Sequence, residues 1–104
     1  MKNESGLKPL GRAVLVKHYD PPKGLIELPD SVADRYAMLE QRAIVVEVGP
    51  AAWPDEPPRA KVGDKVLISK MSGYMCKGPL DGVRYVLVND RDIFCGIAGE
   101  FANV

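Results

Sequence analysis

The β-strand signal of this chain is plainest in the stretch Lys61-Val62-Gly63-Asp64-Lys65-Val66-Leu67-Ile68, where a glycine turn leads into apolar and β-branched residues. Gly63-Asp64 is typical of a turn, and Lys65–Ser69 is typical of the strand that follows it. Further runs have the same character, namely Leu10–Lys17, Ala43–Val48, Val83–Val88 and Ile93–Ile97. Many short strands separated by turn residues predict an all-β fold, and specifically a small, irregular β-barrel.

Turn residues separate these runs and account for the acidic side chains near them. Asp81-Gly82 lies between apolar residues, a pattern typical of a tight β-hairpin. Asp64, Asp90 and Asp92 each stand in a turn, where a carboxylate accepts hydrogen bonds from backbone amides. We therefore interpret these aspartates as structural and do not expect an acid/base pair among them.

One segment departs from the β pattern and shows helical spacing instead. Asp30-Ser31 resembles a helix cap. The apolar residues that would share one helix face are Val32, Tyr36, Leu39 and Ala43. The sequence therefore predicts a short helix from Val32 to about Arg42, packed on its own domain or on a neighbouring subunit.

A second unusual segment is the proline-rich stretch Pro50–Pro58 around Trp53. Proline cannot donate to a strand ladder, so we predict a stiff exposed loop here rather than a strand. Two interpretations of Trp53 stay open. Its side chain is either an exposed interface anchor or is folded back under its own loop.

Composition bounds the function. The 104 residues suit one domain, and 14 Lys and Arg balance 14 Asp and Glu, which disfavours nucleic-acid binding. No apolar run is long enough to cross a membrane and the start is polar, so we expect a soluble, cytoplasmic protein. Cys76 and Cys95 are expected to be free thiols, and neither they nor His18 show metal-ligand spacing. No phosphate loop, dinucleotide fingerprint or nucleophile elbow is present, so we expect neither an enzyme nor a cofactor.

Four short motifs occur in an order and spacing that resemble a known family. They are Lys8-Pro9-Leu10, Val48-Gly49, Lys61–Val66 and Asp92-Ile93. Through them residues 7–97 resemble the ten-kilodalton, GroES-like co-chaperonins, the lids of chaperonin rings. The resemblance divides the chain into an N-terminal extension at 1–6, a GroES-like β-barrel domain at 7–97 and a C-terminal tail at 98–104. Within the barrel it implies a long docking loop at about 18–42 and a roof-region loop at about 50–60.

The resemblance implies a lid that carries no catalytic residues. Such lids form a heptameric dome and dock on a GroEL-like chaperonin ring in its ATP-bound state through a mobile apolar loop. The chain's residues at those docking positions are Gly24, Leu25, Ile26, Glu27, Leu28 and Pro29. In an extended segment Ile26 and Leu28 point to one side and Glu27 to the other, so two apolar anchors can enter a groove.

The resemblance also implies a subunit interface. The first and last strands of neighbouring subunits pair in this family, and the matching segments here are Leu10–Val16 and Ile93–Ile97. The interface residues expected from this are Leu10, Val14, Val16, Ile93, Cys95 and Ile97. A closed ring would cover the strand edges that otherwise invite aggregation.

Departures from the family pattern keep alternatives open. Arg12-Ala13 replaces an Asp-Arg pair, Leu25 replaces a second glycine, and Glu27 replaces an apolar residue. One alternative is a GroES-fold structural or decoration subunit of a virion or other large assembly, and a virus-encoded co-chaperonin is another. A further alternative for the loop is that Ile26 and Leu28 pack on the barrel's own core.

Overall fold

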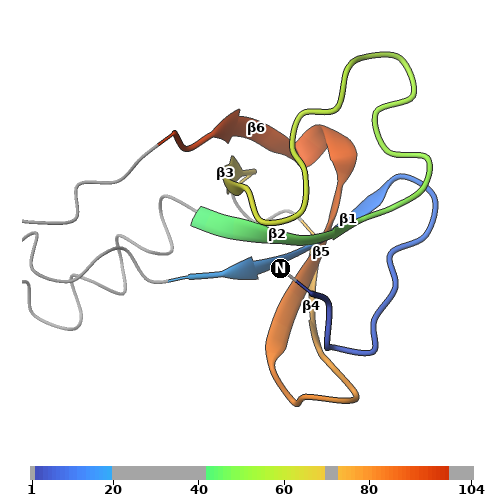
Figure 1. The fold of residues 1–104 in the computed structure, drawn as a ribbon, viewed down its shortest axis with the longest axis vertical. Helices are drawn as coiled ribbons and strands as arrows, with labels where there is room; N and C mark the ends of the chain where they lie inside the picture. The colour runs from blue at the N-terminus through green and yellow to red at the C-terminus, as the bar shows by residue number, and fades with distance from the viewer. Residues whose placement is uncertain (1, 20–41, 70–72, 99–104) are drawn as a thin grey trace, which may run out of the picture.

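The computed structural model describes residues 2–19, 42–69 and 73–98. Within these ranges the chain is built almost entirely from β-strands (Figure 1). The elements are β1 (Ala13–His18), β2 (Arg42–Val48), β3 (Lys65–Ile68), β4 (Tyr74–Lys77), β5 (Arg84–Asn89), the short 3-10 helix η1 (Asp90–Asp92) and β6 (Ile93–Gly96). The all-β prediction is confirmed.

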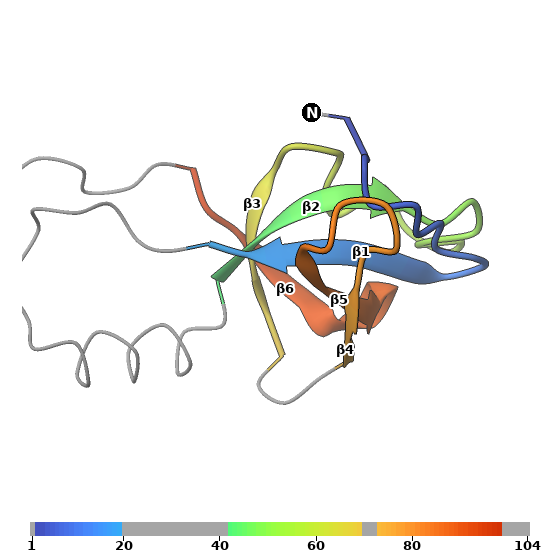
Figure 2. The same ribbon diagram turned by 90° about the horizontal axis from the view of Figure 1, so that it is seen from below.

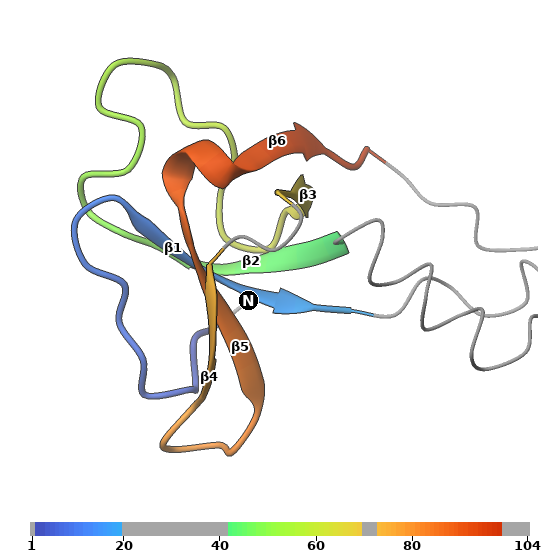
Figure 3. The same cartoon turned by 180° about the vertical axis from the view of Figure 1, so that it is seen from behind.

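The strands form one 6-stranded antiparallel sheet in the order β4-β5-β1-β2-β3-β6. The sheet is strongly bent, and η1 carries the chain from β5 across to β6 (Figure 3). One hydrophobic cluster therefore gathers buried residues from strands that stand far apart in the sheet order, such as Val16, Val45, Val66, Val88 and Ile93. A sheet curled around a shared main core is the arrangement expected of a small barrel.

β1 is one of the two central strands, and Figure 2 shows it running beside the other, β2. Val14 and Val16 belong to the main core, whereas Leu15 belongs to a second cluster with Val46 and Tyr85. Because side chains alternate along a strand, the unbroken apolar run means that both faces of β1 are covered. Burying each of these side chains contributes on the order of 2 kcal/mol before entropy is subtracted.

The predicted Asp81-Gly82 hairpin turn is confirmed between β4 and β5. Gly82 has φ of 69°, a backbone conformation that favours glycine. Asp81 Oδ1 accepts a hydrogen bond from Val83 N at 3.0 Å, and Tyr85 Oη donates to Asp81 Oδ2. This bond to the carboxylate, assisted by burial, raises the pKa of Tyr85 to about 12. β4 is not among the strands expected from the sequence.

The first residues of the chain pack onto the fold. Asn3 Nδ2 donates to Glu47 on β2, and Ser5 Oγ donates to Asn3 Oδ1 at 2.6 Å. Ser5 O accepts from Leu80 N at 3.0 Å, and Ser5 is fully buried. This segment therefore covers the second cluster, to which Leu7 also contributes.

Some predicted boundaries differ from the structure. Leu10 precedes β1 because Leu10 O accepts from Ala13 N in a turn, where Gly11 has φ of 59°. Of the helix predicted from Val32 to about Arg42, only Arg42 lies within the described residues, and it begins β2. Ala43, which was placed both on that helix face and at the start of the strand Ala43–Val48, is a fully buried strand residue, as the second assignment expected.

Candidate functional site: the loop stem and the β6 edge

The docking positions Gly24, Leu25, Ile26, Glu27, Leu28 and Pro29 lie outside the described residues. The stem from which that segment departs is described. β1 ends at His18 and β2 begins at Arg42, and His18 pairs with Ala43 in the antiparallel ladder. The His18 ring Nδ1 also lies 2.9 Å from Arg42 O. Both ends of the intervening segment are thus fixed side by side at one end of the sheet (Figure 1).

A cation–π contact adds to this stem. The Lys65 ammonium lies 5.0 Å from the centre of the Tyr19 ring. Tyr19 follows β1 and Lys65 begins β3, so the contact links the loop's departure point to a third strand. Such a contact is worth about 0.5–1 kcal/mol at an exposed site.

The last strand presents an open edge. Among the described residues β6 pairs with β3 alone, and it stands at one end of the sheet order. Ile93 is 1% exposed and belongs to the core, whereas Cys95 is exposed and Ile97 is half-buried. Phe94, which sequence reasoning did not single out, is 68% exposed beside this edge. The sequence identifies Phe94 only as an apolar residue of the last strand and does not indicate that its side chain is exposed.

The first segment of the expected interface divides into two parts. Leu10 is 73% exposed and is free to contact another molecule. Val14 and Val16 are fully buried in the chain's own core. β1 is also paired on both sides, with β2 and β5, so its backbone has no open edge for a neighbour. Within this first segment, strand pairing by a second copy must therefore use residues before Ala13.

A buried polar network that the sequence did not predict lies behind the β6 edge. Asp90 is 2% exposed, and its Oδ2 accepts from Trp53 N at 2.8 Å and from Arg12 Nε at 3.2 Å. Asp90 O accepts from Trp53 Nε1 at 2.9 Å, and Asp90 N donates to Arg12 O at 3.0 Å. The hydrogen bond from the Trp53 amide, reinforced by Arg12, holds the pKa of Asp90 below its usual value despite burial.

This network decides between the two interpretations of Trp53. The side chain is only 5% exposed, so it is folded back under its own loop rather than displayed as an anchor. Trp53 has φ of 51°, a strained value that its hydrogen bonds to Asp90 hold in place. The prolines around it remain exposed, as predicted for the stretch Pro50–Pro58.

The structural interpretation of the turn aspartates is confirmed. Asp64 Oδ2 accepts from Lys61 N and Asp92 Oδ2 accepts from Asn89 N, each at 3.0 Å. With Asp90 bound to Trp53 N, all three carboxylates cap backbone amides. Within residues 2–19, 42–69 and 73–98, no group of three or more His, Cys, Asp and Glu residues could hold a metal ion. No helix in the described part of the chain is long and apolar enough to cross a membrane.

A shallow, open groove of about 300 Å³ continues from the end of β6. It is lined by Arg59 from the proline-rich loop, by Val66 of β3, and by Gly96 and Ile97 at the end of β6. We refer to the open edge of β6, the exposed Phe94 and this groove together as the β6 edge.

Comparison with known proteins agrees with this fold. The model of the chaperonin 10 Kd subunit family matches residues 6–97. The chain belongs to the chaperonin 10 family. A co-chaperonin GroES from Lawsonia intracellularis is 36% identical over 101 residues, covering 90% of this chain and 94% of the relative. The co-chaperonin GroES of Methylacidiphilum infernorum (isolate V4) is 36% identical over 103 residues, covering 92% and 98%.

Membership in the chaperonin 10 family bears on the alternatives left open by the sequence. The matched range spans the β1–β2 stem, the segment between those strands and most of the β6 edge. The relatives are co-chaperonins by name, and neither they nor the family model favours a structural subunit of a virion or other assembly.

Proposed function

We propose that this chaperonin 10 protein is a co-chaperonin, a ring-shaped lid that caps an ATP-driven chaperonin chamber and assists protein folding. The observation that carries the proposal is the near full-length similarity to two proteins named co-chaperonin GroES. The paired strands β1 and β2, between which the predicted docking segment lies in the sequence, are consistent with it. The protein acts without catalytic residues or a cofactor, in the cytoplasm.

The docking element is the segment that carries Gly24, Leu25, Ile26, Glu27, Leu28 and Pro29. Ile26 and Leu28 enter an apolar groove of a GroEL-like ring in its ATP-bound state, aided by Leu25, while Glu27 stays in water. A loop that becomes ordered on docking binds weakly because part of the contact energy is spent on ordering.

The lid is a homo-oligomeric ring, in which the β6 edge of one subunit contacts the segment around Leu10 of the next. A ring of seven subunits would present seven weak docking loops at once, and their combined binding would be firm yet releasable. A contact between two different surfaces closes into a ring when the rotation between subunits allows it.

The anchor assignment is tested with the double variant Ile26→Ser and Leu28→Ser. We expect it to lose ATP-dependent binding to a GroEL-type chaperonin while its ring persists, because serine removes the apolar contacts. A matched control is Leu80→Ser, which removes an exposed apolar residue (79% exposed) in the β4–β5 turn. Binding that survives in the double variant would rule out Ile26 and Leu28 as anchors.

A further inference from the structure

The backbone of β6 shows which of its groups are open to a partner. Ser69 N donates to Asp92 O at 2.8 Å, so the carbonyl before β6 faces β3. Successive residues of an antiparallel strand direct their backbone groups to opposite sides, so Ile93 turns its carbonyl away from β3. The first acceptor on the open side of β6 is therefore Ile93 O.

That acceptor is already occupied within the chain. Arg59 Nη1 donates to Ile93 O at 2.7 Å. The guanidinium is held in this position by Glu56, which accepts from Arg59 Nε at 2.6 Å and from Nη2 at 3.1 Å. The two-point contact fixes the plane of the guanidinium, which a single contact would not do. Arg59 thus lies across the start of the open edge.

The loop that carries Arg59 is itself fixed to the same part of the fold. Trp53 binds Asp90 through its backbone amide and its indole, and Asp90 lies only three residues before Ile93. Gly49 N also donates to Ala13 O, and Ala51 N donates to Gly11 O, both at 2.8 Å. The arginine is therefore presented by a segment anchored at several points.

A β-bulge interrupts β6 directly after Ile93. Leu67 of β3 pairs with Cys95 and Ile68 pairs with Ile93, so Phe94 is the extra residue. A bulge bends its strand and interrupts regular pairing. Beyond it Ile97 N donates to Lys65 O at 2.8 Å, so Ile97 and, two residues earlier, Cys95 direct their backbone groups to β3. Gly96 between them therefore turns its backbone groups to the open side, where it lines the groove.

We propose that Arg59 sets the register in which a second copy of this chain adds to the β6 edge, by closing Ile93 O and leaving pairing to begin at Gly96. The inference rests on the proposed ring. The occupant is a second copy because Leu10 and Phe94 remain 73% and 68% exposed in the isolated chain, and contact between copies would bury both. Arg59 is a positioning residue: it excludes neighbouring registers rather than supplying the contact.

The test compares Arg59→Met with Arg59→Lys by native mass spectrometry and sedimentation velocity over a range of concentrations. Methionine keeps much of the aliphatic stem but removes the donor, so Ile93 O becomes available to an incoming strand. We expect wild type and Arg59→Lys to form one ring stoichiometry. Arg59→Met is expected to form several, because the correct register loses about tenfold in preference when one charged hydrogen bond is removed.

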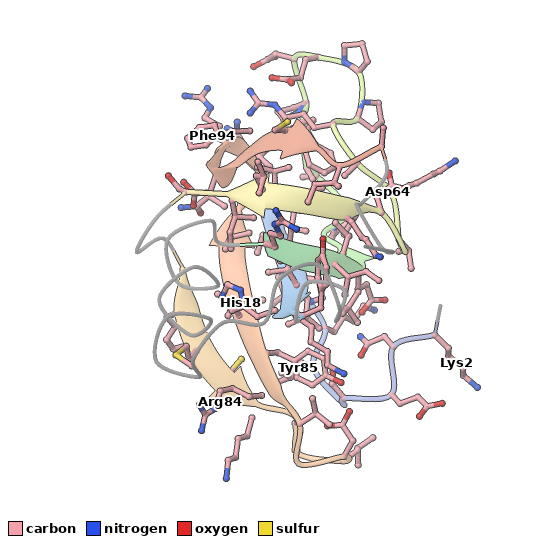
Figure 4. All side chains as sticks on the ribbon, turned by 90° about the vertical axis from the view of Figure 1, so that its left-hand side faces the viewer. Lys2, His18, Asp64, Arg84, Tyr85 and Phe94 are labelled. Carbon is pink, nitrogen blue, oxygen red and sulfur yellow. The ribbon has the colours of Figure 1, made fainter. Side chains whose placement is uncertain are left out.

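Two further variants separate register from general stability. Arg84→Met removes an exposed arginine at the start of β5 and should leave one stoichiometry, because Arg84 lies far below Phe94 in Figure 4. Trp53→Phe loosens the loop that carries Arg59 and should broaden the distribution less than Arg59→Met does. Thermal melting of each variant shows whether it is folded under the assay conditions.

The outcomes distinguish this inference from the proposed function. A single ring of unchanged stoichiometry in Arg59→Met overturns the role of Arg59 and leaves the co-chaperonin proposal standing. A wild-type chain that stays monomeric at every concentration contradicts the proposed ring and this inference with it.

Discussion

Trp53 and Asp90 are joined by two hydrogen bonds that use different parts of each residue. The Trp53 backbone amide donates to the Asp90 carboxylate at 2.8 Å, and the indole Nε1 donates to the Asp90 backbone carbonyl at 2.9 Å. Both residues are buried, at 5% and 2% exposed. The pair therefore closes the proline-rich loop onto the turn that leads into β6.

Trp53→Phe tests the indole bond. The Asp90 carbonyl loses its buried donor, so the free energy of unfolding should fall by about 1–3 kcal/mol. Urea denaturation followed by circular dichroism measures the change. Tyr74→Phe, which removes a polar group from a side chain in a residue 67% exposed, is the control and should change stability by less than about 0.5 kcal/mol. Equal effects of the two variants would contradict the structural role of the indole.

Asp90→Asn tests the charge at the centre of the network. The pKa of Asp90 is lowered in the folded state, so the unfolded chain binds the proton more tightly. The carboxylate therefore stabilises the fold above its ordinary pKa of 3.8, and this stabilisation is lost as the pH falls through the lower folded value. Measured between pH 2 and 6 by urea denaturation, wild type should lose more stability on acidification than Asp90→Asn. Parallel profiles would show that Asp90 does not contribute through its charge.

Much of this fold can be predicted from local sequence. The strand after Gly63-Asp64 and the Asp81-Gly82 hairpin depend on residues that are neighbours in the chain, and both were predicted. The Trp53–Asp90 contact joins residues 37 positions apart, so no local sequence pattern could predict it. Leu10 was predicted within the first strand because it is apolar, but the turn at Gly11 ends the ladder before it.

The interface residues of the candidate site were harder to predict from the sequence, for a different reason. Val14 and Val16 were expected at an interface, yet an apolar strand residue can be covered by its own chain or by another. Only the strand order, which pairs β1 on both sides, shows that these two belong to the core. The contact of Arg59 with β6 could not be predicted from the sequence, because the acceptor, Ile93 O, is a backbone carbonyl of the kind that every residue possesses.

Tyr85→Phe tests the hydrogen bond to Asp81 in the β4–β5 turn. Its loss should cost about 1 kcal/mol at neutral pH. The pKa of Tyr85 is raised to about 12 from 10.0, so its stabilising effect is complete below pH 10 and is lost as the pH rises through about 12. Absorbance titration of the tyrosinate band should show a late-titrating component in wild type that Tyr85→Phe removes. A wild-type curve in which every tyrosine titrates near pH 10 would contradict the bond.

Gly73→Ala tests the close approach at the start of β4. Gly73 has φ of 73°, and a Cβ placed there would lie 2.2 Å from Leu87 O. Because a backbone atom cannot move aside easily, we expect a loss of at least about 2 kcal/mol in unfolding free energy. Gly96→Ala is the control, since a Cβ there meets nothing within 4 Å. A thermal melt in which both variants match wild type would show that β4 adopts a different backbone.

The most direct test of the co-chaperonin role is co-elution of the purified wild-type protein with a GroEL-type bacterial chaperonin on size exclusion, with and without ATP. We predict a complex that forms with ATP and is absent without it, because the proposed docking requires the ATP-bound state of the ring. A protein that elutes alone under both conditions, as a stable ring of its own, would contradict the role as a lid.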